Sequence, residues 1–125
     1  MDAVDLIERQ HNAYNRRDLL AFCECFSEDI QVIEFESEKI LLEGKSAFEA
    51  AFEKRFQSRN LQSKLIHRAD LGNLIVDHEV VEGINPIPIS AVVIYKVENL
   101  KIVRMTTILS KINSWFCSST VFYSM

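Results

Sequence analysis

The sequence predicts one α+β domain, in which about three helices lie on one face of a curved antiparallel sheet. Three observations support this prediction. Apolar residues recur at helical spacing through the N-terminal half, whereas from Leu61 onward the apolar pattern changes to a period of two. Helices followed by a run of strands are typical of α+β domains. A chain of 125 residues with 48% hydrophobic residues is large enough for one hydrophobic core.

The helices are predicted from apolar spacing and from capping residues. The first helix is indicated by Val4, Ile7, His11 and Tyr14, which fall on one helical face. Asp18 suits the N-cap of a shorter second helix. A third helix is expected after Gly44, where Ser46 and Glu49 match a capping box. Its aromatic stripe, Phe48, Phe52 and Phe56 with Ala51, is typical of a core-facing helix.

Two hairpins are predicted in the C-terminal half. Gly72 and Asn73 form a two-residue turn signal, which sets His67 opposite His78 and Arg68 opposite Asp77. The face with the two histidines carries more apolar residues, so we expect it to face the core. Arg68, Asp77 and Glu79 are expected to form cross-strand pairs on the opposite face, in solvent or in a subunit contact. The second hairpin joins residues 87–97 to 101–109 through Glu98, Asn99 and Leu100.

This order of elements resembles the nuclear transport factor two-like superfamily, which includes SnoaL-like polyketide cyclases and ketosteroid isomerases. The resemblance rests on the segments Tyr14–Phe22 and Phe26–Glu34 and covers residues 4–109. The segment from Gly72 to Gly83 is similar to a stretch of small, uncharacterised SnoaL-like proteins. The resemblance implies a cone-shaped sheet wrapped around the helices, the cystatin-like α+β barrel, with a pocket inside. Fold alone assigns no reaction.

Charge and composition exclude several classes of partner. The net charge of −4 and the mixing of both signs along the chain argue against a nucleic-acid-binding protein. The acidic N-terminus lacks the pattern of a signal peptide, and no apolar run reaches the about 18 residues of a membrane span. We therefore expect a cytoplasmic protein that acts without a membrane.

Glu34 is the first candidate for chemistry, because it falls where the proton-abstracting carboxylate of ketosteroid isomerase-like proteins is expected from the resemblance. A buried carboxylate has a raised pKa and can take and return a proton. The alternative is a solvated residue at the end of its strand. The oxyanion donors of the isomerases are not matched, because Gln10 and Val93 occupy those positions. Classical steroid isomerisation is therefore not expected.

His78 is the second catalytic candidate, paired with His67 on the expected core face. Histidine titrates near neutral pH and suits a pocket role. The alternative is two half-buried rings that bond to neighbouring hydroxyls. No metal site is predicted, because catalytic zinc needs three protein ligands, and no cofactor is expected. The predicted ligand pocket comprises Gln10, Tyr14, Phe52, Phe56, His67 and Tyr95.

Two functional classes remain open from the sequence. One is a cofactor-independent isomerase, cyclase or dehydratase acting on a small apolar ligand, and the other is a non-catalytic ligand-binding or dimerisation module. Protein-transport scaffolding is a weaker option. The SnoaL-like domain is predicted over residues 1–109, followed by a C-terminal extension, residues 110–125. We expect a homodimer through the outer sheet face, which is predicted to carry Ile75, Val92 and Ile94.

Overall fold

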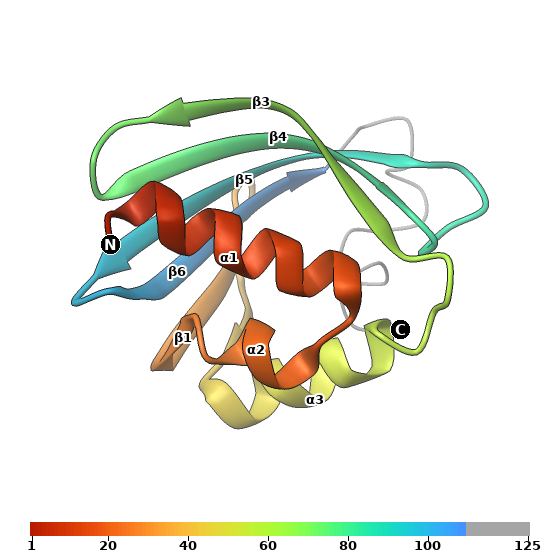
Figure 1. The fold of residues 1–125 in the computed structure, drawn as a ribbon, viewed down its shortest axis with the longest axis horizontal. Helices are drawn as coiled ribbons and strands as arrows, with labels where there is room; N and C mark the ends of the chain where they lie inside the picture. The colour runs from red at the N-terminus through yellow and green to blue at the C-terminus, as the bar shows by residue number, and fades with distance from the viewer. Residues whose placement is uncertain (110–125) are drawn as a thin grey trace.

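Within residues 1–109, which the computed structural model describes, the chain forms three helices and six strands (Figure 1). In chain order these elements are α1 (Ala3–Arg16), α2 (Leu19–Cys23), β1 (Phe26–Glu34), β2 (Ile40–Glu43), α3 (Lys45–Arg55), β3 (Gln62–Asp70), β4 (Leu74–Glu82), β5 (Ile89–Glu98) and β6 (Lys101–Leu109). The predicted C-terminal extension lies outside the described residues.

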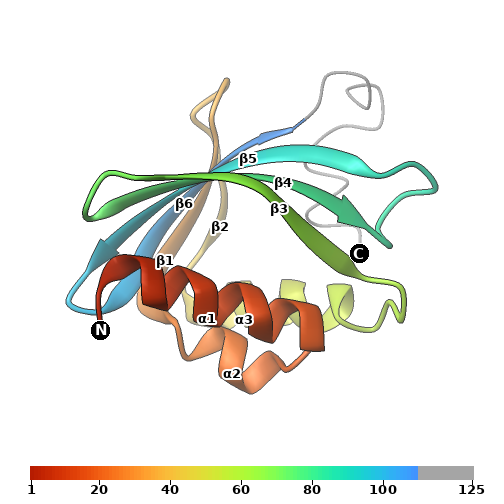
Figure 2. The same cartoon turned by 45° about the horizontal axis from the view of Figure 1, so that its top comes forward.

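The strands form one curved, open sheet in the order β2-β1-β6-β5-β4-β3. Figure 2 shows the sheet arched over α1 and α3, with α2 farther from the sheet. This arrangement confirms the predicted α+β cone. One ladder in residues 1–109 departs from the predicted antiparallel sheet, because β1 and β6 run parallel. The chain reaches β6 only after the β3–β5 meander, and β6 then lies beside β1 in the same direction.

The helix boundaries follow their caps. Asp2 and Asp5 form a reciprocal capping box at the start of α1, with Asp5 N–H donating to Asp2 Oδ1 at 2.9 Å. Asp18 is the N-cap of α2, as predicted, and accepts from the Ala21 N–H at 3.1 Å. The predicted capping box at Ser46 is wrong. Gly44 is the N-cap of α3 and makes no side-chain cap bond, so Ser46 lies inside the helix.

The aromatic stripe of α3 belongs to the core, as predicted. Phe48 packs against Phe26 of β1 at 4.4 Å between ring centroids and against Phe52 at 4.6 Å. Phe22 of α2 lies 4.8 Å from Phe26, so one cluster of rings joins all three elements. Burying each ring contributes about 1.5–3 kcal/mol. The cluster holds α2 and α3 against β1.

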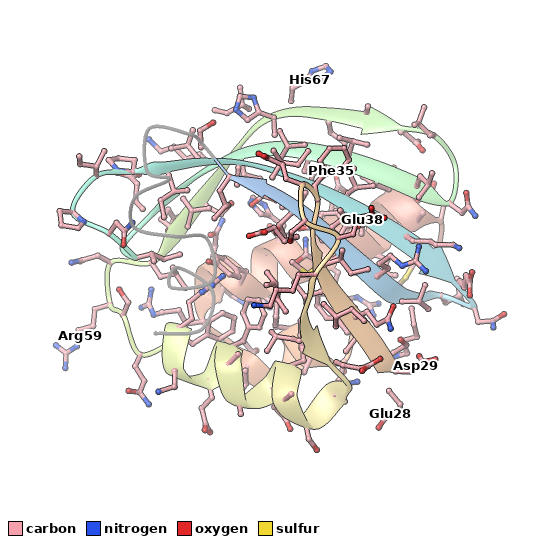
Figure 3. The ribbon with its side chains drawn as sticks, turned by 180° about the vertical axis from the view of Figure 1, so that it is seen from behind. Glu28, Asp29, Phe35, Glu38, Arg59 and His67 are labelled. Carbon is pink, nitrogen blue, oxygen red and sulfur yellow. The ribbon has the colours of Figure 1, made fainter. Side chains whose placement is uncertain are left out.

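The β3/β4 hairpin has the predicted register, because His67 pairs with His78 and Arg68 pairs with Asp77. The predicted faces of this hairpin are reversed. Asp77 and Glu79 are buried on the concave face, whereas His67 is exposed and points away from the sheet (Figure 3). Ile75 is likewise buried on the concave face, so it does not contribute to an outer surface.

In β3 the exposed position of His67 has a local cause, whereas β4 pairs with β5 without irregularity. The pairing is irregular between Leu65 and His67, where β3 contains one residue more than β4. A bulge shifts the alternation of side chains by one position. Leu65 and Arg68 therefore lie on the same side, against α1, and line one surface pocket with His11. His67 is left on the convex side.

Candidate functional site

A cavity of about 50 Å³ lies inside the cone, between the helices and the concave face of β4, β5 and β6. Its wall is mostly apolar and includes Phe22, Phe52, Val81, Ile89, Val93 and Met105. A buried water needs about 10–15 Å³ of this kind of volume, so the space admits a few waters or a molecule of a few heavy atoms. Polar groups gather at one part of the wall: Gln10, His11, Tyr14, Arg55, Glu79 and Tyr95.

Glu79 is the central polar group of this wall and is only 6% exposed. Its Oε1 accepts a hydrogen bond of 2.7 Å from the Ser63 hydroxyl, and its Oε2 accepts one of 3.3 Å from the Tyr95 hydroxyl. Gln10 Nε2 in turn donates to the Tyr95 oxygen at 3.3 Å and to its own helix at Ile7 O at 3.0 Å. The carboxyl group is thus held from two strands, with Gln10 of α1 behind Tyr95.

The position of Glu79 follows from the alternation of β4. Ile75, Asp77, Glu79 and Val81 occupy successive inward positions of the strand, and each of them is buried. Glu79 pairs with Ala91 of β5. Because Ala91 has a short side chain, the space beside Glu79 stays open, and Ala91 itself lines the cavity. A larger residue at position 91 would fill the cavity.

Helix α1 supplies three cavity residues from one face. Gln10 and Tyr14 are one helical turn apart, and His11 lies beside them. Tyr14 is fixed by ring contacts on both sides, with Phe22 at 5.8 Å and Phe56 at 5.4 Å between centroids. The aromatic core therefore positions the helix side of the cavity.

Burial sets the protonation of the site. Burial raises the pKa of Glu79, and nearby Asp77 raises it further, while the hydrogen bonds from Ser63 and Tyr95 act in the opposite direction. Burial also raises the pKa of Tyr95 well above its usual range, so its phenol stays protonated and donates to Glu79. A carboxyl group whose pKa is raised by burial keeps its proton to a higher pH than an exposed one, and such a group can act as a general acid or base.

A buried ion pair lies next to this carboxyl group. Asp77 has 0% exposure, and both of its oxygens accept from Arg68, at 2.7 Å from Nε and 2.8 Å from Nη2. Glu8 of α1 lies 3.4 Å from Arg68 Nη1. The hydrogen bonds to Asp77 raise the pKa of Arg68. The pair balances the Asp77 charge and links α1 to the β3/β4 hairpin.

Four of the predicted pocket residues line this cavity: Gln10, Tyr14, Phe52 and Tyr95. Phe56 is buried and packs edge-on against Tyr14, behind the cavity wall. His67 lies on the convex side and is exposed, because of the bulge in β3. His67 therefore does not line this cavity.

The two predicted catalytic residues do not line this cavity. Glu34 lies at the end of β1, half-buried, and its Oε1 accepts a hydrogen bond of 2.6 Å from Ser37 in the following turn. His78 lies on the convex face, where its Nε2 is 2.9 Å from the Ser90 hydroxyl. For His78 this agrees with the alternative given from the sequence, a half-buried ring bonded to a neighbouring hydroxyl.

The sequence reasoning missed Glu79, Ser63 and His11 as members of one site. The period-two pattern predicted the β4 strand correctly, but its acidic residues indicated that the side with Asp77 and Glu79 would face solvent. The sequence of β5 contains a signal for the buried face, because Tyr95 belongs to the inward-facing alternate residues whereas Lys96 belongs to the outward-facing ones. Ile75 pairs with Tyr95 in the β4/β5 ladder, and this pairing places Asp77 and Glu79 on the buried face.

Within residues 1–109, no group of three or more histidine, cysteine, aspartate or glutamate side chains is arranged to hold a metal ion. The groups around Glu79 are two hydroxyls, from Ser63 and Tyr95, and the amide of Gln10, and they interact through hydrogen bonds. In the same part of the chain, no helix is long and apolar enough to span a membrane.

Comparison with known proteins identifies the fold. The model of the SnoaL-like domain matches residues 7–105. An NTF2-like protein of unknown function from Cytophaga hutchinsonii is 16% identical, with 90% of this chain and 93% of that chain covered and a TM-score of 0.75. Curated protein sequences show no significant match.

Two further solved structures have the same fold. A candidate SnoaL-like polyketide cyclase from Shewanella denitrificans is 12% identical, with 86% of this chain and 90% of that chain covered and a TM-score of 0.72. A protein with a ketosteroid isomerase-like fold from Catenulispora acidiphila, solved with trimethylamine, is 10% identical, with 83% and 84% covered and a TM-score of 0.67. At these identities the likeness concerns the fold alone.

Proposed function

We propose, since this chain belongs to the family of SnoaL-like domains, that it binds a small, mainly apolar molecule beside Glu79 and moves a proton on it without a cofactor. The observation that carries this proposal is a carboxyl group, 6% exposed, on the wall of an apolar cavity. Such a group is the ordinary means of general acid–base catalysis in isomerases, cyclases and dehydratases. The cytoplasmic setting expected from the sequence is part of the proposal.

The size of the cavity narrows the ligand class. A volume of about 50 Å³ is far below the about 300–1,000 Å³ of pockets for drug-sized ligands. The proposed ligand therefore has a few heavy atoms, an apolar body and one polar group that meets Glu79 and Tyr95. A small carbonyl compound with an acidic α-hydrogen has this character. A steroid does not fit the cavity.

Deuterium exchange tests the proton transfer without knowledge of the natural substrate. The protein is incubated in D2O with a panel of small enolisable aldehydes and ketones, and loss of the α-hydrogen signal is followed by proton NMR. General acid–base groups contribute about 10²–10⁴-fold to rate. We expect Glu79→Gln to lower the exchange rate by this order, because an amide cannot take the proton.

Glu34→Gln is the matched control, since it is the same substitution at the carboxylate predicted from the family resemblance. We expect this variant to exchange deuterium at the parent rate. If Glu34→Gln loses exchange and Glu79→Gln keeps it, Glu34 is the proton carrier and the assignment to Glu79 is wrong. If the parent protein exchanges no compound above the buffer rate, the enzymatic part of the proposal fails.

The second candidate function is a non-catalytic ligand-binding or dimerisation module. The observation that favours it is the filling of the cone by rings: Phe22, Phe48 and Phe52 are each at most 2% exposed and occupy much of the interior. Val92 and Ile94 lie half-buried on the convex face of β5, where a second copy would pack. Sedimentation of the parent and of Val92→Lys distinguishes a dimer from a monomer at this face.

A further inference from the structure

A chain of hydrogen bonds leads from Glu79 to the outside of the cone. The Ser63 hydroxyl donates to Glu79 Oε1 at 2.7 Å, and the Ser63 oxygen itself lies 3.1 Å from His11 Nε2. A hydroxyl has one hydrogen and two acceptor lone pairs. Because that hydrogen goes to Glu79, the serine oxygen accepts from His11, and Nε2 carries a hydrogen in this arrangement.

His11 lies between the interior and the surface. It lines the inner cavity together with Glu79. It also lines a separate surface pocket of about 320 Å³, formed with Glu8, Asn12, Leu65 and Arg68. The imidazole is half-buried, whereas Glu79 is 6% exposed. One ring therefore touches both the site and the solvent side of α1.

The backbone of Ser63 is held in place by a residue other than His11 and Glu79. Asn15 of α1 accepts from the Ser63 N–H at 2.8 Å and donates to the Ser63 carbonyl at 3.0 Å. These two bonds fix the backbone of Ser63 against α1, the helix that also carries His11. Asn15 thus holds Ser63, the middle member of the chain of hydrogen bonds, against the helix that carries its outer member, His11.

We propose that His11 and Ser63 form a proton relay that connects Glu79 with solvent at the surface pocket of α1. The inference rests on the proposed function, in which Glu79 gains or loses a proton in each turnover. In the inward step, protonated His11 releases the Nε2 hydrogen to the Ser63 oxygen, and Ser63 releases its own hydrogen to the Glu79 carboxylate. The products are neutral His11, an intact Ser63 hydroxyl and neutral Glu79, so that charge and atoms balance.

The outward step reverses this transfer, and His11 then exchanges its proton with water. Histidine suits the outer position because its pKa lies near neutrality. Burial lowers the pKa of His11, Asp77 raises it and Arg68 lowers it. The charged and titratable groups near His11 are Glu8, Arg68 and Asp77. Those near Glu79 are Asp77, Arg68 and Tyr95, with Tyr14 and Arg55 on the same cavity wall.

The relay is tested by the rate at which Glu79 changes protonation after a pH jump, which needs no substrate. Time-resolved infrared spectroscopy follows the band of the protonated carboxyl group, assigned as Glu79 by its absence from Glu79→Gln. We expect His11→Phe and Ser63→Ala to slow the approach to equilibrium by about 10²-fold, the lower end of the range of general acid–base effects. Ser63→Thr keeps a hydroxyl and is expected to restore the parent rate.

The control is a second histidine–serine pair on the convex face. His78 Nε2 lies 2.9 Å from the Ser90 hydroxyl, and the His78 side chain lies on the face of β4 opposite to the Glu79 side chain. His78→Phe is therefore expected to leave the rate unchanged. Parent-like thermal unfolding of each variant shows that a changed rate does not reflect a loss of fold.

Two results overturn the relay. One is a parent-like rate in both His11→Phe and Ser63→Ala, which means that Glu79 exchanges its proton directly through the cavity. The other is a Glu79 carboxyl band that never titrates between the acid and alkaline limits of folding. The proposed function fails separately, because deuterium exchange by the parent protein decides it and the infrared measurement does not use a ligand.

Discussion

Arg68 binds both carboxylate oxygens of Asp77 across the β3/β4 ladder, at 2.7 Å from Nε and 2.8 Å from Nη2. Asp77 is completely buried, so the guanidinium replaces the water that its charge would otherwise attract. A carboxylate that loses such a partner inside a protein is strongly destabilised.

Arg68→Ala should lower the free energy of unfolding by about 3–5 kcal/mol, because it leaves Asp77 buried without its counter-charge. The exposed ion pair of Lys96 and Glu98, at 3.4 Å, provides the control. Lys96→Ala should cost less than about 1 kcal/mol, since exposed pairs are screened by water. Urea unfolding measures both values. Equal effects of the two substitutions would show that the buried pair has no special role.

The raised pKa of Glu79 predicts a pH-dependent effect of Glu79→Gln. In the unfolded chain the pKa of this carboxyl group is near its ordinary value of 4.5, whereas in the folded protein burial raises it. The folded state therefore binds more protons between the two values. The parent protein loses this part of its stability as pH rises from 4.5 through the folded pKa.

Glutamine cannot ionise, so the variant should gain stability relative to the parent as pH rises. We expect the difference in free energy of unfolding between Glu79→Gln and the parent to shift in favour of the variant as pH rises from 4.5 through the pKa of Glu79 in the folded protein. Asp70→Asn, at an exposed carboxylate of the same sheet, is the control. Urea titrations at each pH check the sign, and a constant difference would contradict the raised pKa.

The β5/β6 turn contains a leucine in an unfavourable backbone conformation. Asn99 and Leu100 have φ values of 51° and 61°, the left-handed pair of a type I′ turn. Asn-Gly is the preferred sequence for this turn, because glycine has no side chain to clash. Leu100→Gly should therefore stabilise the protein by about 1 kcal/mol.

Leu20→Gly is the matched control for the turn. Both leucines are exposed, at 70% for Leu20 and 60% for Leu100, so the loss of each side chain is similar. Leu20 lies in α2, where glycine should cost about 1 kcal/mol. Opposite signs in thermal unfolding are expected for the same substitution. A loss of stability in both variants would mean that the leucine at position 100 makes a contact that outweighs its backbone strain.

Gly83 lies where β4 ends, close to the chain before β3. A Cβ built at this position would be 2.5 Å from the Asn60 carbonyl carbon. Gly72, at a similar φ of 87°, has nothing within 4 Å of a built Cβ. Gly72→Ala should cost about 1–3 kcal/mol from backbone strain, and Gly83→Ala should cost more, because backbone atoms must also move. Equal unfolding midpoints would show that this loop gives way easily.

In the β3/β4 hairpin the register could be predicted from the sequence, but the buried face could not. Local turn chemistry at Gly72 and Asn73 determines register, and the pairing of His67 with His78 followed directly from it. The choice of face depends on tertiary partners that no local pattern contains. Asp77 can be buried because Arg68, its partner across the ladder, binds its carboxylate. The exposed position of His67 depends on the bulge in β3, and a bulge has no reliable sequence signature.

The candidate site was only partly accessible for the same reason. Gln10 and Tyr14 were found because helical spacing places them on the inner face of α1. Glu79 was set aside because acidic residues usually face solvent. Its burial depends on Ser63 and Tyr95, which come from two other strands. Contacts of this kind appear only when the sheet is assembled.

The bonds between Asn15 and the peptide group of Ser63 also affect how the molecule behaves at high concentration. β3 is an end strand of the open sheet, and the unpaired peptide groups of such strands are templates for intermolecular strand addition. At Ser63 both backbone groups are already bonded within the molecule. An incoming chain therefore finds a break in the row of free donors and acceptors, and α1 protects this part of the edge from seeding fibrils.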